Sequence, residues 1–125
     1  MRKVLLSIKP QFVAQIQQGN KRFEYRRKIF KDTSVNTMLI YSSSPVCKVI
    51  GECRIARIHS GLVNEIWEQS AMYSGITADY YYQYFEGLDR AFAIELSDVV
   101  IYDTPKDLAD YQISRAPQFF QYIDL

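Results

Sequence analysis

Apolar residues recur at β-strand spacing along most of this chain and at helical spacing in three short stretches. The stretches with strand character are residues 2–8, 22–29, 37–41, 46–59, 92–96 and 99–102, with a candidate closing strand in APQFFQYI. Helices are predicted from Pro10 to a cap at Gly19, over residues 62–67, and between an N-cap at Thr77 and Gly87. Strands and helices do not alternate regularly, so we predict an α+β fold, a small mixed β-barrel with short inserted helices.

The length of 125 residues fits a single domain, which we place over residues 1–125. Hydrophobic residues make up 48% of the chain and charged residues 23%, which is ordinary for a globular protein. The apolar run at residues 4–8 is too short for a signal peptide or a membrane span. We therefore expect a cytoplasmic protein that does not associate with membranes.

The two cysteines, Cys47 and Cys53, fall in the expected strand at residues 46–59. Six residues of strand would separate them by about 20 Å, which excludes a disulfide between them. His59 is the only histidine, so a structural zinc site lacks ligands, and no phosphate-binding loop or dinucleotide fingerprint is present. We expect two buried cysteines, no metal and no cofactor.

The net charge of +1 conceals a strong asymmetry between the two halves of the sequence. Residues 1–60 contain 12 Lys and Arg against three acids, whereas residues 61–125 contain three against 11. A basic half is typical of a protein that binds nucleic acid or another polyanion. The other explanation is that the two halves pack together and neutralise each other, and the sequence alone leaves both open.

The densest basic stretch is GNKRFEYRRK at residues 19–28, which surrounds a single acid, Glu24. Strand periodicity places Glu24 and Arg26 on one face, where their side chains can form an ion pair. Lys21 would stand at the mouth of the strand, as a hydrogen-bond donor or, if desolvated, as a base or nucleophile. The alternative is an exposed strand face whose charges protect a sheet edge, and the spacing alone favours this alternative.

Four motifs occur in order along the chain: G-x-K-x-x-E-x-R at residues 19–26, IYSSSPVCKVIGE, GLDRAFAIEL and RAPQFFQYI. Together they resemble the ASCH domain family of the PUA-like superfamily over nearly the whole chain. The resemblance implies a compact pseudobarrel with a role in RNA processing or translation-linked regulation, because several PUA-like branches bind RNA. Some members are ribonucleases and others are amidohydrolases that act on N4-acetylcytidine. The amidohydrolase branch has G-x-K-x-x-T, and this chain departs from it with Glu24 in place of the Thr.

At residues 19–28 the resemblance favours a functional site over an exposed strand face. Its candidate residues are Lys21, Glu24 and Arg26. Lys21 and Arg26 are expected to bind a phosphate or a base carbonyl, and Glu24 to accept a hydrogen bond from a base amine. If the chain is an enzyme, Lys21 and Glu24 are its catalytic pair. Ser43 and Ser44 are candidate phosphate ligands, although they fit a plain β-turn equally well. The cations expected to attract a nucleic-acid backbone are Arg22, Arg27, Lys28 and Lys31.

Five further residues have a functional and a structural interpretation. Tyr25 and Tyr41 could stack on an unpaired base, but their strand positions favour core packing. Trp67 lies on the apolar stripe of its helix and is predicted to be part of the core. Glu95 is predicted to be a solvated strand residue rather than a second carboxylate of the site. His59 is predicted to be a loop residue rather than a proton shuttle.

The leading hypothesis from the sequence is a domain that binds RNA or a modified nucleoside in a basic cleft. The first alternative is a hydrolase, either an amidohydrolase on an acylated cytidine-like nucleoside or a ribonuclease. The second alternative is a module that binds protein partners through its basic and acidic surfaces.

Overall fold

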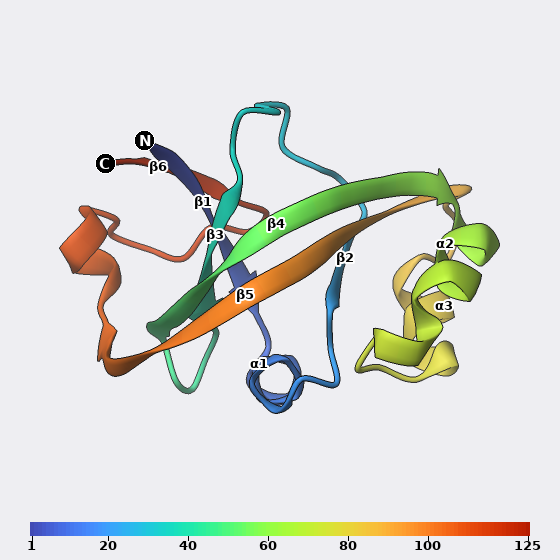
Figure 1. Cartoon of the computed structure of the whole chain (residues 1–125), viewed down its shortest axis with the longest axis horizontal. Helices are drawn as coiled ribbons and strands as arrows, with labels where there is room; N and C mark the ends of the chain where they lie inside the picture. Colours follow the sequence, from blue (N-terminus) through green and yellow to red (C-terminus); the bar gives the residue numbers. More distant parts are fainter.

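The computed structural model describes all 125 residues and contains one mixed sheet of six strands in the order β2-β5-β4-β3-β1-β6. β1 and β3 are parallel neighbours, and all other neighbouring strands are antiparallel. The strands are β1 Arg2–Ile8, β2 Phe23–Arg26, β3 Thr37–Ser42, β4 Lys48–Leu62, β5 Arg90–Lys106 and β6 Gln121–Asp124. The long β4 and β5 run side by side across the whole molecule (Figure 1).

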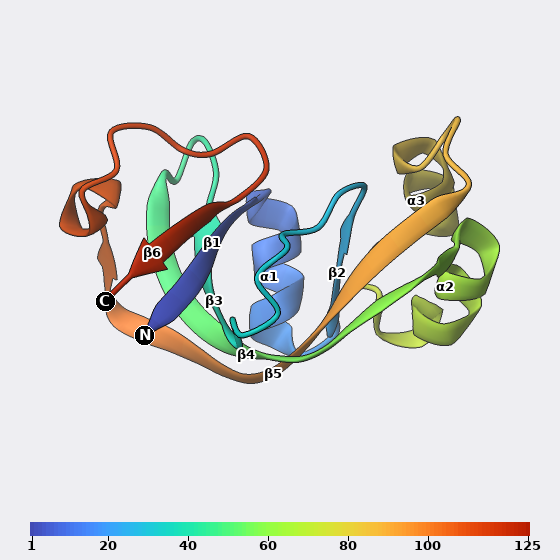
Figure 2. The ribbon, with the colours of Figure 1, turned by 90° about the horizontal axis from the view of Figure 1, so that it is seen from above.

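The α+β class is confirmed, but the sheet does not close into a barrel, because β2 and β6 remain as its two edges. Of the candidate closing strand APQFFQYI, only residues 121–123 belong to a strand, β6, which pairs with β1. This pairing brings the two ends of the chain together, and the Met1 amino group donates to the carbonyl oxygen of Leu125 at 2.8 Å (Figure 1). The result is a strongly curved open sheet (Figure 2).

Three α-helices fill the predicted places: α1 Pro10–Gln18, α2 Val63–Ser70 and α3 Ala78–Tyr84. Two short 3₁₀ helices follow β-strand or helix ends, η1 Ala71–Tyr73 and η2 Leu108–Tyr111. Pro10 occupies the first turn of α1, and Gly19 caps its end with a φ of 83°, in the left-handed region that glycine adopts without strain. Thr77 caps α3 as predicted, because its side chain accepts a hydrogen bond from the Tyr80 N–H. No helix has the length and apolar character needed to cross a membrane.

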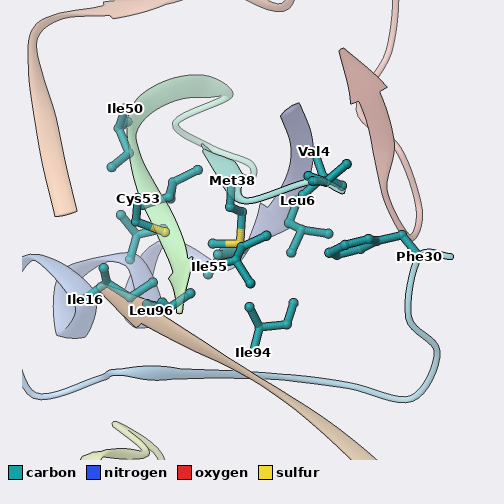
Figure 3. Packing of buried hydrophobic residues seen from close by; sticks show 14 residues of the cluster. Val4, Leu6, Ile16, Phe30, Met38, Ile50, Cys53, Ile55, Ile94 and Leu96 are labelled. Carbon is teal, nitrogen blue, oxygen red and sulfur yellow. The ribbon is translucent and has the colours of Figure 1, made fainter. Parts of the chain in front are cut away.

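The main core lies in the hollow of the sheet, where α1 sits between β1 and β3 on one side and β2 on the other (Figure 2). Apolar side chains from β1, β3, β4 and β5 point into this interior, and Phe30 closes one side of it (Figure 3). A second cluster holds α2 and α3 against the far end of the β4–β5 ribbon, with Tyr25 and Tyr81 buried inside it and Trp67 packed against it. Tyr41 is also buried, so core packing of Tyr25, Tyr41 and Trp67 is confirmed.

The boundaries of two predicted strands are wrong. The strand expected at residues 22–29 ends at Arg26, because the chain bends there and carries Phe30 into the core. The pieces expected at residues 92–96 and 99–102 are one strand, β5, and Asp98 between them has a φ of 50° at one of three register shifts against β4. The register of β4 against β5 also shifts between Ile55 and Arg57.

Two predictions about single residues are also wrong. Cys47 lies just before β4 with a φ of 54° and is exposed, whereas Cys53 is buried as expected and its burial raises the pKa of the thiol to about 12. His59 lies within β4, which continues to Leu62, and its Nε2 is 2.7 Å from Glu95 on the neighbouring strand. Both cysteine thiols are free.

Candidate functional site

A pocket of about 250 Å³ opens where the curvature of the sheet brings its β2 edge near the C-terminal end of β1. Its walls come from these two strands, from Phe12 of α1, from α3, and from the segment 118–120 that precedes β6. Arg26 spans the gap between the edges: Nη2 donates to the carbonyl oxygen of Ser7 at 2.7 Å, and Nη1 lies 3.5 Å from that of Phe119. The pocket therefore depends on the convergence of several separate parts of the chain, three of which are joined by Arg26.

Lys21, Glu24 and Arg26 come together at one side of this pocket. The Glu24 Oε2 atom accepts a hydrogen bond from Arg26 Nη2 at 2.7 Å, and Oε1 is 3.7 Å from the Nζ atom of Lys21. The charged face of β2 points into the molecule rather than to solvent, since Glu24 is 7% exposed and Lys21 only 2%. The interpretation as an exposed, protected sheet edge is therefore wrong.

Lys21 is fixed beneath the site rather than inside it. Its Nζ donates to the carbonyl oxygen of Ser74 at 2.9 Å and lies 5.0 Å from the centre of the Tyr25 ring. Burial lowers the pKa of Lys21, and the nearby Glu24 carboxylate opposes this shift. Gly75 packs so closely that a Cβ atom there would lie 2.5 Å from that of Lys21. Lys21 does not line the pocket itself, but it contacts three residues that do: Glu24, Tyr25 and Phe12.

Three cations at the rim each lie over an aromatic ring that also lines the pocket. The pairs are Lys9 with Tyr80, Arg27 with Tyr84, and Lys28 with Phe119, at 5.5, 4.1 and 5.3 Å from the ring centres. Glu24 is the one acid in the lining, so none of the 11 acids of residues 61–125 faces the pocket. The pocket is thus basic and aromatic at its rim.

The remaining predicted site residues lie outside the pocket. Arg22 stacks on the ring of Tyr73 at 4.2 Å, on another part of the surface. Lys31 is exposed, and only its backbone N–H makes a hydrogen bond, to the Tyr122 hydroxyl. Ser43 donates its backbone N–H to the carbonyl oxygen of Ile8, and Ser44 is exposed in the adjacent turn.

Four residues of the rim were not predicted from the sequence: Lys9, Tyr80, Tyr84 and Phe119. Of the four tyrosines at positions 80–84, only Tyr81 is fully buried. Burial raises the pKa of Tyr84, as expected for a ring set into the wall of the pocket. No three His, Cys, Asp or Glu side chains gather as a metal site would require.

Glu95 does not belong to the pocket, in agreement with its predicted place on the sheet surface. Its carboxylate is 40% exposed and pairs with His59, whose ring lies near that of Phe23. The two residues form a cross-strand pair on the face of the sheet opposite Glu24.

No family model matches the sequence. An ASCH domain-containing ribonuclease of Zymomonas mobilis is 32% identical over 97 residues, which cover 78% of this chain and 66% of that protein. The ribosomal protein uL22 of Ureaplasma parvum is 34% identical over 97 residues, but the match covers 75% of this chain and only 31% of uL22. The chain therefore spans about a third of the uL22 relative.

The crystal structure of ASCH from Zymomonas mobilis superposes with a TM-score of 0.88 and 28% identity, over 98% of this chain and 87% of the other. The N-terminal domain of McrB from Staphylothermus marinus shares the fold alone, with a TM-score of 0.54 and 14% identity. The fold agrees with the crystal structure of the Zymomonas protein, and the sequence identity with the ribonuclease extends over most of this chain. The chain therefore belongs to the ASCH domain family.

Proposed function

We propose that the chain binds RNA, as a single-stranded segment or as a nucleoside, in the pocket between β1, β2 and α3. The observation that carries this proposal is the rim, where three cations lie on aromatic rings around a pocket with a carboxylate inside. Aromatic rings stack on unpaired bases, and Lys and Arg contact the phosphates that join them. The name of the Zymomonas relative, a ribonuclease, supports RNA as the ligand class.

Each part of the site has its own role in this proposal. Glu24 and Arg26 contact the base, because both line the pocket and carry polar groups into it. Lys21 positions Glu24 from beneath and does not touch the ligand. Four predicted site residues lie outside the pocket and are given no contact with the ligand: Ser43, Ser44, Arg22 and Lys31.

A salt titration of a labelled single-stranded RNA, followed by fluorescence anisotropy, tests the binding. Contacts between phosphates and the three rim cations predict a log–log slope of about −2, so that affinity falls more than tenfold between about 50 and 200 mM salt. The double variant Arg27→Ala, Lys28→Ala should reduce the slope to about −0.7 and weaken binding. The matched control is Arg54→Ala, Arg57→Ala, which removes the same charge from exposed positions of β4 outside the pocket.

Equal loss of affinity in both double variants would place the RNA elsewhere and contradict the proposal. A complete lack of binding to single-stranded RNA, with a protein partner recovered instead, would favour a protein-interaction module.

Cleavage of the bound RNA is the second candidate function, and it is favoured by the name of the relative and by the placement of Glu24. A carboxylate in the pocket can accept the proton of a 2′-hydroxyl as its oxygen attacks the neighbouring phosphorus, while the bond to the 5′-oxygen breaks and this oxygen takes a proton from water. Incubation of end-labelled RNA with wild type and Glu24→Gln tests this step. Fragments that end in a cyclic phosphate, formed by wild type alone, would support cleavage, whereas intact RNA at saturating protein would leave binding as the function.

A further inference from the structure

The Glu24 carboxylate has more acceptor capacity than the protein uses. It accepts one hydrogen bond, at Oε2 from Arg26, while Oε1 has only the Lys21 ammonium at 3.7 Å, beyond hydrogen-bond distance. A carboxylate offers about four acceptor positions, and a buried one without donors is unfavourable. The side chain is 9% exposed and lines the pocket, so a ligand in the pocket can reach its free acceptor positions.

The neighbouring Arg26 guanidinium has donors to spare. Nη2 donates to Ser7 and to Glu24, both at 2.7 Å, whereas Nη1 has a single long contact of 3.5 Å with the carbonyl oxygen of Phe119. The Nε–H is buried and has no partner at all. The donor of Arg26 that a ligand can use is therefore the weakly paired Nη1, which together with Glu24 offers an acceptor and a donor at one side of the pocket.

We infer that the pocket is selective for a guanine base, a conclusion that rests on the proposed RNA binding. Guanine presents two neighbouring donors, N1–H and the N2 amine, next to the O6 carbonyl. The two donors match the free acceptor positions of Glu24, and O6 matches the Nη1 donor of Arg26. The rings of Phe12 and Tyr84 line the walls of the same pocket, where they can contact the faces of the base.

The other three bases fill this site less completely. Adenine and cytosine each offer one amine beside a ring-nitrogen acceptor, and uracil offers one N–H between two carbonyls. Each can place one donor on Glu24 and one acceptor on Arg26, but none can place two donors on the carboxylate. A missing hydrogen bond to a charged partner lowers affinity by about tenfold or more.

Five labelled pentanucleotides, UUNUU with N as guanine, inosine, adenine, cytosine or uracil, test this inference on the wild-type protein. Inosine is the decisive probe, because it keeps O6 and N1–H and lacks only the N2 amine. We expect the guanine oligonucleotide to bind most tightly and the inosine oligonucleotide to bind at least about tenfold more weakly.

A protein variant provides the second arm of the test. Glu24→Gln keeps the shape of the side chain but replaces one acceptor oxygen with a donor, so the preference for guanine over inosine should fall to near unity. Glu95→Gln is the matched control, since this carboxylate lies outside the pocket, and it should leave the preference unchanged. If Glu24→Gln does not fold, the oligonucleotide series on wild type still decides the question.

The test distinguishes a failure of the guanine selectivity from a failure of RNA binding itself. Equal affinity for guanine and inosine, or tighter binding of another base, would overturn the selectivity and leave RNA binding standing. No binding of any of the five oligonucleotides would overturn both the selectivity and the proposed function.

Discussion

Two groups of three charged side chains lie in different parts of this molecule and differ in how far they are exposed to solvent. The pocket triad consists of Lys21, Glu24 and Arg26, whose side chains are 1%, 9% and 14% exposed. The terminal triad consists of Arg2, Asp32 and Asp124, whose side chains are 41%, 28% and 68% exposed. The pocket triad places two cations around one carboxylate beside the pocket. The terminal triad places one guanidinium between two carboxylates and joins the ends of the chain to the loop after β2.

The two arginines differ in how fully their donors are used. In the terminal triad, Arg2 donates through Nε and Nη2 to Asp124 and through Nη1 to Asp32, so every nitrogen has a partner. In the pocket triad, Arg26 leaves Nε without a partner. The exposed triad is completely paired, whereas the buried triad keeps one donor without a partner and is the site that we propose for the ligand.

The largest effect expected from this contrast is that of Glu24→Ala. Removing this carboxylate leaves Lys21 and Arg26 as buried cations without a counterion, and the free energy of unfolding should fall by about 3–5 kcal/mol. Urea denaturation at pH 7 measures the loss, with Asp124→Ala as the matched variant in the exposed triad. A loss for Glu24→Ala as small as that for Asp124→Ala would mean that water solvates the pocket triad as well as the terminal one.

Replacing Lys21 by Met should have a smaller effect, about 1–2 kcal/mol at pH 7. The Ser74 carbonyl loses its donor and Glu24 loses one of two cations, but no buried charge is left without a partner. The pKa of Lys21 is lowered in the folded protein, so between that pKa and 10.5 the unfolded chain binds more protons and wild type becomes more stable as pH rises. The variant lacks this dependence.

The difference in stability between wild type and Lys21→Met should therefore grow as pH rises toward 10.5. Denaturation at several pH values up to 10 measures it. A difference that shrinks over this range would mean that the folded protein raises the pKa of Lys21 instead of lowering it.

Much of the fold follows from local sequence signals, and closure of the sheet does not. Alternation predicts the strands, and Pro10, Gly19 and Thr77 predict helix ends, because each acts through its own backbone geometry. Whether β6 pairs with β2 or stays at an edge depends on the curvature of the whole sheet, which no single segment determines. The bulge at Asp98 is likewise a property of two paired strands.

The candidate site, too, is predictable from the sequence only in part. The sequence predicts Lys21, Glu24 and Arg26 as a group because they belong to one short motif. In the structure their side chains are in contact. Alternation cannot tell which face of a strand is buried when both faces carry large side chains, so the burial of Glu24 was not predictable. Tyr84 and Phe119 reach the rim from distant parts of the chain, and only the folded structure shows them beside Arg27 and Lys28.

The smallest effect is expected in the terminal triad, from Asp124→Asn. Hydrogen bonding from Arg2 lowers the pKa of Asp124 below its ordinary value of 3.8, so its contribution to stability is present above pH 3.8 and disappears as pH falls through the lowered pKa. Because these side chains are exposed, salt at about 1 M should also remove most of the difference between wild type and variant. Thermal unfolding at two salt concentrations and at several pH values between 2 and 7 measures both dependences. A difference that survives high salt would show that the terminal triad, like the pocket triad, is shielded from solvent.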